Sequence, residues 1–233
     1  MTYDKYIESF FSEYNLVNVL ADKNDCKTLR LRHKKIGKDL VLHRFPNRIA
    51  AYESLAKLEC ENLPLIYDVI DLEDCQIVLE EYISGITIAD VMDTGRYTYH
   101  GAKKVVQGVC NALSVLHSRN IVHRDIKPEN IMVESSGRVV LIDFNASRTI
   151  TPDSKDTVVM GTVGYASPEQ IGIAQSDSRT DIYAIGVLLN VMMTGRHPSE
   201  IIAKGKAGRI VRKCTNVNPN DRYQTVEKLS GAL

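Results

Sequence analysis

The stretch His123-Arg124-Asp125-Ile126-Lys127-Pro128-Glu129-Asn130 is followed, thirteen residues after Asn130, by Asp143-Phe144-Asn145. These residue types, in this order, supply the groups that phosphoryl transfer needs. Asp125 can accept a hydroxyl proton, and Lys127 can stabilise the charge of a transferring phosphoryl group. Asn130 and Asp143 carry the hard oxygen ligands that Mg²⁺ prefers. The stretch therefore predicts a metal-assisted phosphotransfer site.

Further segments follow in a fixed order and carry a resemblance to a known family. They are Gly161-Thr162-Val163-Gly164-Tyr165-Ala166-Ser167-Pro168-Glu169, then Asp181, then Pro219-Asn220-Asp221-Arg222. Together with the first two motifs, they resemble the protein kinase family, although Ser167 replaces the usual alanine. The resemblance covers nearly the whole chain, is strong from Val78 onward, and implies that Arg222 pairs with Glu169. A bacterial member of the family is suggested by the style of the motifs.

The resemblance implies a role for each residue of the acceptor site. Asp125 is the expected catalytic base, because a base must orient the acceptor hydroxyl and take its proton. Lys127 is typical of serine/threonine kinases, so the expected acceptor is an aliphatic hydroxyl of a protein. Thr162 is expected to hydrogen-bond to Asp125 and Lys127. His123 and Phe144 are interpreted as packing residues.

The expected cofactors are ATP and Mg²⁺, or Mn²⁺, with Asn130 and Asp143 as the metal ligands. Asn145 stands where the family has the glycine of Asp-Phe-Gly. Asparagine tolerates positive φ better than other non-glycine residues, so the turn is expected to form.

Regulation by phosphorylation is a further expectation of the resemblance. In the family, the arginine at the position of Arg124 binds phosphate on the activation loop through charge-assisted hydrogen bonds. The candidate acceptors between Asp143 and Glu169 are Thr149, Thr151, Ser154 and Thr157, and the sequence does not rank them.

The nucleotide side departs from the family pattern. The stretch from Leu20 to Thr28 contains no glycine, whereas a kinase needs a glycine-rich loop over the phosphates. Asp22 and Asp25 repel phosphate unless lysines offset them. The nucleotide-binding candidates in this stretch are Ala21, Lys23 and Lys27.

The strand lysine that grips phosphate in the family is also missing. Counting from Gly37, its position falls on His43, and Arg44 is the alternative if the strand slips by one residue. Strand alternation supports His43, since Leu40 and Leu42 share the buried face while Val41 and His43 face the expected cleft. Glu53 is the candidate glutamate to pair with the residue that replaces the strand lysine, or it is simply a solvated helix residue.

The segment from Glu80 to Gly85 resembles the hinge that contacts adenine through backbone groups. The remaining nucleotide-binding candidates are Val41, Glu81, Ile83 and Met132. Glu80 occupies the gatekeeper position and needs a partner or a place at the cleft edge, because an unpaired buried carboxylate is costly.

The predicted fold is α+β and two-lobed, resembling a protein kinase. Residues 1–83 form the nucleotide-binding lobe, a small antiparallel sheet with one helix, and residues 84–233 form the mainly helical catalytic lobe. Periodicity predicts a hairpin of two strands over 27–45 and two further strands over 65–71 and 76–83. It also predicts helices over 48–59, 99–119 and 181–194. Asn47 is expected to cap the first of these helices, and Gly195 is expected to end the last.

The composition of the chain indicates which partners to exclude and which cellular compartment to expect. The 29 Lys and Arg residues balance 29 Asp and Glu residues, so no global field favours nucleic acid or an anionic membrane. The five cysteines are scattered without a C-x-x-C pair, which favours reduced thiols and a cytoplasmic protein. No signal peptide or long apolar run is found, so no membrane segment is expected in this chain.

Three functions remain open at this point. The leading one is a serine/threonine protein kinase. The alternative is a pseudokinase that acts as a binding or scaffold module, which the missing glycines and lysine favour. A small-molecule kinase of the aminoglycoside type is disfavoured by the 161–169 segment and by Lys127.

Overall fold

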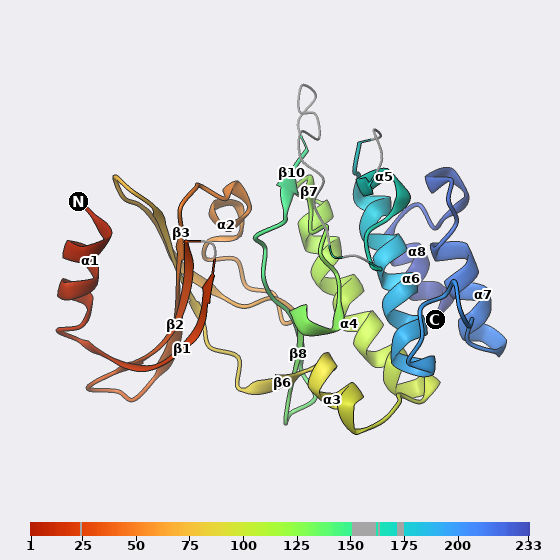
Figure 1. Ribbon diagram of the computed structural model, residues 1–233, viewed down its shortest axis with the longest axis horizontal. Coiled ribbons are helices and arrows are strands. Elements are labelled where there is room, and N and C mark those ends of the chain that lie inside the picture. Colours follow the sequence, from red (N-terminus) through yellow and green to blue (C-terminus); the bar gives the residue numbers. More distant parts are fainter. Residues whose placement is uncertain (24, 151–161, 163, 172–174) are drawn as a thin grey trace. The chain divides into compact units, whose positions relative to one another are not determined.

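The computed structural model describes residues 1–23, 25–150, 162, 164–171 and 175–233, and Figure 1 shows them as a ribbon. The chain divides into two compact units. Unit 1 comprises residues 1–60 and 64–83, and unit 2 comprises residues 61–63 and 84–233. Unit 1 is built on an antiparallel sheet and unit 2 mainly on helices, which confirms the predicted fold class. The nucleotide-binding and catalytic roles expected for 1–83 and 84–233 stay predictions.

The described part of unit 1 contains a five-stranded antiparallel sheet in the order β1-β2-β3-β5-β4. Its strands are β1 (Tyr14–Lys23), β2 (Cys26–His33), β3 (Asp39–Phe45), β4 (Ile66–Asp71) and β5 (Gln76–Glu81). The hairpin predicted over 27–45 is confirmed as β2 and β3. Gly37 has φ +68° in the connecting turn, a conformation that glycine adopts without strain.

One face of this sheet forms the apolar core of unit 1. Leucines and isoleucine from the central strands point to this face, as their alternation with polar residues requires. The buried residues are Leu29, Leu31, Leu40, Leu42, Cys75, Ile77 and Leu79, and Tyr3, Tyr6, Ile7 and Phe10 of helix α1 (Tyr3–Phe10) pack against them. Val41 and His43 lie on the opposite face, with Phe45 and Tyr52.

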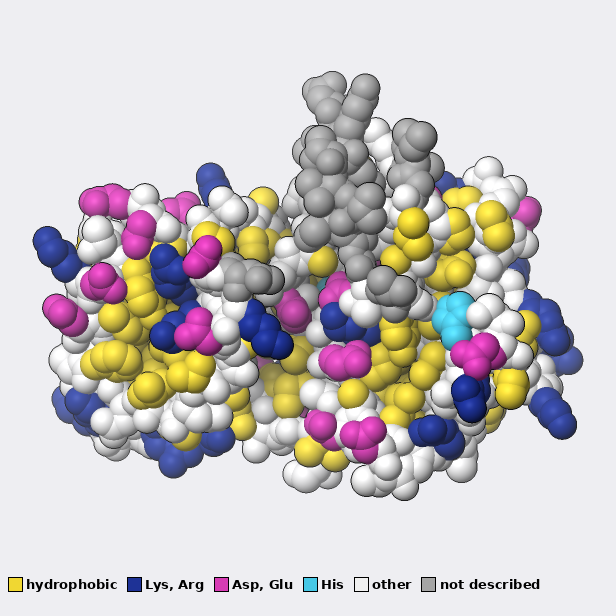
Figure 2. All heavy atoms as spheres, in the orientation of Figure 1, with side chains coloured by type: hydrophobic (Ala, Val, Ile, Leu, Met, Phe, Trp, Pro, Cys, Tyr) yellow, Lys and Arg dark blue, Asp and Glu magenta, His cyan; other side chains and the backbone are white. Residues whose placement is uncertain are grey.

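Helix α1 and strand β1 correct the sequence interpretation, which gave unit 1 one helix and started its strands near residue 27. The position of α1 depends on distant partners. The Met1 ammonium lies 2.6 Å from Glu73 Oε1, and the Tyr3 N–H donates to Asp74 at 3.0 Å. Strand β1 is a sheet edge, and its side chains Leu16, Val17, Val19 and Leu20 are 41% to 48% exposed. Figure 2 shows apolar side chains gathered on the surface of this unit.

The helix predicted over 48–59 is shorter, which is a second correction. Helix α2 spans Ala50–Leu55, and Asn47 does not cap it. Ile49 occupies the N-cap position, and its N–H donates to Gln76 Oε1 at 2.9 Å. Lys57 has φ +60° and its N–H donates to Ile66 O at 2.9 Å. The chain therefore leaves the helix to pair with β4, and this backbone pairing ends the helix before its apolar stripe does.

Unit 2 contains the predicted long helices. The helices expected over 99–119 and 181–194 are confirmed as α4 (Tyr99–His117) and α6 (Ser178–Thr194), and Gly195 ends α6 in the left-handed region. The other described helices are α3 (Ile88–Thr94), α5 (Pro168–Ile171), α7 (Gly205–Cys214) and α8 (Val226–Ala232), with 3₁₀ turns at Pro128–Asn130 and Pro219–Asp221. Helix α4 packs against α6, α8 and β9.

Short strands of unit 2 position the motif residues. They are β6 (Gly85–Thr87), β7 (Ile121–Val122), β8 (Ile131–Glu134), β9 (Val139–Leu141) and β10 (Arg148–Thr149). Strands β6, β8 and β9 form one antiparallel sheet, and β7 pairs with β10. Residues 61–63 belong to this unit because Leu141 N–H donates to Asn62 O and the Asn62 amide donates to Val139 O.

No helix within the described residues is long and apolar enough to cross a membrane.

Candidate active site

Asp125 lies at the centre of a hydrogen-bond network in unit 2. Its Oδ2 accepts hydrogen bonds from Lys127 Nζ at 2.7 Å and from Asn130 Nδ2 at 2.9 Å, and its Oδ1 accepts one from Thr162 Oγ1 at 2.6 Å. Lys127 Nζ also donates to Thr162 Oγ1 at 2.9 Å. The expected contacts of Thr162 with Asp125 and Lys127 are therefore present. Burial raises the pKa of Asp125, but the bonds from Lys127 and Thr162 outweigh it and leave the pKa below its usual value. Asp125 is thus a carboxylate at neutral pH.

The backbone of the Asp125 loop is held by Asp181 at the start of α6. Asp181 accepts hydrogen bonds from the N–H groups of His123 at 3.0 Å and Arg124 at 2.8 Å, and from His117 Nε2 at 2.8 Å. Arg124 has φ +66°, which is strained for a residue with a long side chain. The fully buried Asp181 carboxylate stabilises this strained turn. Burial raises the pKa of Asp181, but the hydrogen bonds from His117 and from the Arg124 N–H lower it overall.

His123 and Phe144 are completely buried. Their rings meet edge to face with centroids 5.5 Å apart, and His123 Nε2 lies 3.3 Å from Ile142 O. Burial lowers the pKa of His123, so the ring is neutral near pH 7. The geometry agrees with the packing role that the sequence suggested for both residues.

Asn130 and Asp143 lie at the same end of the β8–β9 hairpin. Asn130 directly precedes β8, Asp143 follows β9 by two residues, and the Ile142 N–H donates to Asn130 O at 2.9 Å. The Asn130 amide nitrogen points to Asp125, and Asp143 Oδ1 accepts the Asn145 N–H at 3.1 Å. Neither the Asn130 side-chain oxygen nor Asp143 Oδ2 has a hydrogen-bond partner among the described residues. These two hard oxygens suit Mg²⁺.

The positive φ expected at Asn145 lies instead at Asp143, whose φ is +66°. Asn145 is exposed and has an ordinary negative φ. The turn closes through Ser147, whose N–H and Oγ both donate to Phe144 O. The replacement of glycine is therefore tolerated because the strained conformation falls two residues earlier.

The expected phosphate-binding residue Arg124 donates from Nε to Ala146 O at 2.7 Å. Of the candidate phosphorylation sites, Thr149 belongs to strand β10, and its buried Oγ1 has no hydrogen-bond partner within the described part of the chain. An acceptor in this position is inaccessible. Thr151, Ser154 and Thr157 lie outside the described residues.

The expected pair of Glu169 and Arg222 is confirmed. Arg222 Nη1 and Nη2 donate to the two carboxylate oxygens of Glu169 at 2.6 and 2.8 Å, and both side chains are buried. Thr180 Oγ1 donates to the same carboxylate at 3.1 Å. Gln170, the residue after Glu169, donates from Nε2 to Arg124 O, and this bond links the pair of Glu169 and Arg222 to the Asp125 loop. Burial raises the pKa of Glu169, but Arg222 more than compensates and lowers the pKa overall.

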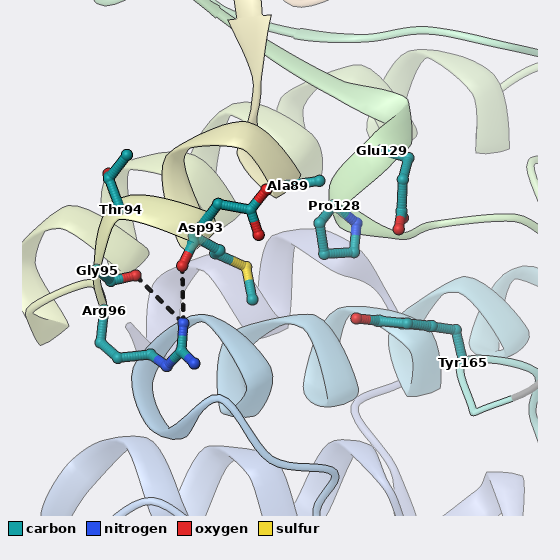
Figure 3. Close-up of a pocket in the computed structure, with 9 residues that line it drawn as sticks. Ala89, Asp93, Thr94, Gly95, Arg96, Pro128, Glu129 and Tyr165 are labelled. Carbon is teal, nitrogen blue, oxygen red and sulfur yellow. Dashed lines mark hydrogen bonds between the residues drawn. The ribbon is translucent and has the colours of Figure 1, made fainter.

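A hollow of about 620 Å³ lies beside the Asp125 network. Figure 3 shows its lining, with Asp93 of α3, Glu129 and Tyr165 around the opening. Glu129 is four residues after Asp125, and Tyr165 donates its N–H to Thr162 O at 2.9 Å. Burial, assisted by the charge of Glu129, raises the pKa of Tyr165 to about 12. Arg96 turns its guanidinium to the carbonyls of Met92 and Gly95. The sequence gave no signal for this hollow, because three separate segments of the chain create it.

In unit 1, the stretch without glycine forms the tight β1–β2 hairpin. Lys23 pairs with Cys26, and Asp25 has φ +61° in the turn. Ala21 lies opposite Thr28, and both Ala21 and Lys23 are exposed. Lys27 Nζ lies 3.4 Å from Asp22, so Lys27 offsets that carboxylate as the sequence suggested.

His43 and Arg44 lie on opposite faces of β3. His43 Nε2 is 2.8 Å from Glu80 Oε1, and His43 Nδ1 is 3.0 Å from Thr28 Oγ1. The required partner of Glu80 is therefore His43. Arg44 lies on the α1 face, where its guanidinium is 5.1 Å from the Tyr3 ring centroid and donates to Asp25 O at 3.0 Å. The strand register thus places His43, not Arg44, on the face of Val41.

The other nucleotide candidates have mixed surroundings. Glu53 forms an ion pair with Arg48 and not with His43 or Arg44. The Glu81 N–H donates to Leu65 O at 2.9 Å, which removes one backbone donor expected for adenine. Ile83 is buried in unit 1, and Met132 is half-buried in strand β8 of unit 2. Their contact with a nucleotide stays a prediction.

Sequence reasoning missed the roles of Thr28, His117 and Asp181 in these networks. Asp181 was noted only as the start of a helix, and the other two were not singled out. A signal existed for Asp181, because a carboxylate in an otherwise apolar helix needs partners when it is buried. Thr28 gave none, since its contact depends on the register between β2 and β3.

Comparison with known proteins agrees with this geometry. The family model of the protein kinase domain matches residues 25–232. Serine/threonine-protein kinase PknB of Mycobacterium tuberculosis is 33% identical over 232 residues, covering 87% of this chain and 35% of that protein. Probable serine/threonine-protein kinase PknB of Lactococcus lactis is 31% identical over 171 residues, covering 72% of this chain and 27% of that protein.

A plant protein shows similar identity. Calmodulin-binding receptor-like cytoplasmic kinase 3 of Arabidopsis thaliana is 35% identical over 198 residues, covering 75% of this chain and 38% of that protein. This chain belongs to the protein kinase family. It spans about a third of the length of the bacterial relatives it matches.

Proposed function

We propose that this chain transfers the γ-phosphoryl group of Mg-ATP to a serine or threonine hydroxyl of a protein. The observation that carries the proposal is the Asp125 network. An ionised carboxylate is held by Lys127, Asn130 and Thr162, and the strained loop that presents it is fixed by Asp181. Such a network holds the carboxylate in one orientation, which a general base requires.

In the proposed reaction, the oxygen of the acceptor hydroxyl forms a bond to the γ-phosphorus of ATP, and the bond from that phosphorus to ADP breaks. Asp125 accepts the proton that the hydroxyl loses. Lys127, beside Asp125, stabilises charge on the transferring group. Thr162 keeps the Asp125 carboxylate in one orientation. Asn130 and Asp143 would hold Mg²⁺ or Mn²⁺, which would supply positive charge to the nucleotide phosphates.

The nature of the acceptor is also part of the proposal. The hollow lined by Asp93, Glu129 and Tyr165 is open and adjoins the Asp125 network, which offers space for a polypeptide segment. The names of the bacterial relatives, which are serine/threonine-protein kinases, support a protein acceptor. Control by phosphorylation is proposed through Arg124, with Thr151, Ser154 and Thr157 as candidate acceptors. A cytoplasmic location is inferred from the five free cysteines.

The experiment measures phosphate incorporation from labelled Mg-ATP into a generic basic protein. Wild type should incorporate phosphate, and Asp125→Asn should reduce the rate by about 10²–10⁴-fold, because the general base is lost. Asp68→Asn is the matched control, since Asp68 is exposed in unit 1 and distant in sequence from every candidate site residue of unit 2. Thermal unfolding checks that each variant is folded.

The pseudokinase alternative predicts a different result. In that case wild type and Asp125→Asn are equally inactive. If ATP also gives no thermal shift in the presence of Mg²⁺, the enzyme proposal is wrong and a binding or scaffold role replaces it.

A further inference from the structure

We propose that Lys23, at the end of strand β1, is the cation that binds the nucleotide phosphates, and that Glu80 and Thr28 withhold His43 from this role. The proposal rests on the proposed function and refines how this chain binds ATP. It is argued from unit 1 alone, from the hydrogen bonds of His43 and the faces on which the basic side chains lie.

The first step concerns the capacity of His43. An imidazole has two nitrogens, whereas a lysine ammonium has three N–H donors. Nε2 of His43 contacts Glu80 and Nδ1 contacts Thr28, both within hydrogen-bond distance. A lysine could contact a glutamate and a phosphate together, but His43 must give up Glu80 or Thr28 to bind a phosphate.

The second step concerns the cost of that exchange. Glu80 is only 6% exposed, and its Oε2 is buried without a hydrogen-bond partner among the described residues. His43 supplies the hydrogen bond to the other oxygen. If His43 turned to a phosphate, the Glu80 carboxylate would remain buried with neither oxygen paired, which is strongly unfavourable. His43 therefore stays paired with Glu80 and does not bind phosphate.

The third step excludes two other cations by their position. Residues directly opposite one another on paired strands share a face. Lys27 lies opposite Arg44, and both are on the face that α1 covers. Lys27 is also paired with Asp22, and Arg44 lies over the Tyr3 ring. Neither points to the face that carries His43.

The fourth step places Lys23 on the correct face. Ala21 lies opposite Thr28, and Thr28 lies opposite His43, so these residues share one face. Lys23 follows Ala21 by two residues and returns to that face by strand alternation. The Lys23 ammonium is exposed and has no acceptor among the described residues. It lies at the hairpin that takes the position of the glycine-rich loop, and supplies there a positive charge in place of close backbone N–H groups.

The test compares dissociation constants for ATP and adenosine by calorimetry, with Mg²⁺ present. Lys23→Ala should weaken ATP binding about tenfold and leave adenosine within about twofold, because a charge-assisted contact to phosphate is lost. Lys23→Arg should restore ATP binding. Lys27→Ala is the matched control, a lysine of the same hairpin on the other face, and should change neither ligand by more than about twofold.

A second variant tests whether His43 contributes to phosphate binding. His43→Gln keeps hydrogen-bonding groups but carries no positive charge, and should change ATP and adenosine binding equally. Selective loss of ATP binding in His43→Gln, with Lys23→Ala unchanged, would overturn the proposal while the kinase function survives. If neither ATP nor adenosine binds wild type, both this proposal and the proposed function are wrong.

Discussion

Asp125 in unit 2 and His43 in unit 1 are each held by neighbouring side chains, but they keep different capacities for a substrate. A carboxylate has about four lone-pair sites, and Asp125 accepts hydrogen bonds from three side chains. Its remaining site can accept a hydroxyl proton. His43 has two nitrogens, and both already have a partner. The comparison teaches that hydrogen bonds can position a side chain for catalysis or binding only when they leave one of its donor or acceptor sites for the substrate.

The two units also differ in how they hold a buried acid. In unit 2, Asp181 and Glu169 each accept several hydrogen bonds. In the described part of unit 1, Glu80 has one oxygen paired and one without a partner. Three substitutions test this difference, and the largest effect is expected where pairing is most complete.

The first prediction concerns the ion pair of Glu169 and Arg222. Arg222→Leu should lower the free energy of unfolding by about 3–5 kcal/mol, because it leaves a buried carboxylate without its cation. Urea unfolding followed by circular dichroism measures the change. The double variant with Glu169→Leu should recover a large part of the loss. A loss below about 1 kcal/mol in the single variant would show that the pair contributes little.

The second prediction concerns Asp181. Asp181→Asn should cost about 1–3 kcal/mol at pH 7, because an amide cannot accept all the hydrogen bonds that the carboxylate accepts. The folded pKa of Asp181 is lowered from 3.8, so its stabilisation is present above the unfolded value and is lost as pH falls through the folded value. The difference between wild type and variant should therefore shrink on acidification below about pH 4.

Urea unfolding at several pH values provides the measurement. Slower phosphate incorporation by Asp181→Asn should accompany the loss of stability, since Asp181 holds the strained Arg124 backbone. A stability difference that stays constant down to the acid transition would contradict the proposed ionised state.

The third prediction is the smallest. Glu80→Gln should change the free energy of unfolding by less than about 1 kcal/mol, because glutamine keeps an acceptor for His43 and removes a buried charge that is only half paired. The same acid-to-amide change thus costs less in unit 1 than in unit 2. A cost larger than that of Asp181→Asn would reverse the comparison.

Much of the fold was predictable because it depends on local periodicity. The apolar faces of α4 and α6, the hairpin of β2 and β3, and the helix stop at Gly195 all follow from neighbouring residues. The acceptor site was predictable for a related reason, since its residues lie close together in the sequence. Asp125, Lys127 and Asn130 are within six positions, and the resemblance to the family added the contact of Thr162 with Asp125.

The nucleotide face was not predictable to the same degree. The sequence correctly put His43 on the face opposite Leu42, since strand alternation is local. It did not identify Glu80 or Thr28 as partners, and it offered Glu53 instead. Those contacts cross three strands, so they depend on how the strands are paired. Helix α1 and the early end of α2 were missed because distant residues, Glu73 and Ile66, hold them in place.

The sequence by itself therefore determined the family and the order of the main elements, and it predicted the residues proposed for the Asp125 site. Tertiary structure alone decided that the buried Glu80 carboxylate pairs with His43. The physical reason is the range of the interactions. Periodicity and turn chemistry act over a few residues, whereas the partner of a buried charge is chosen by strand register across a sheet.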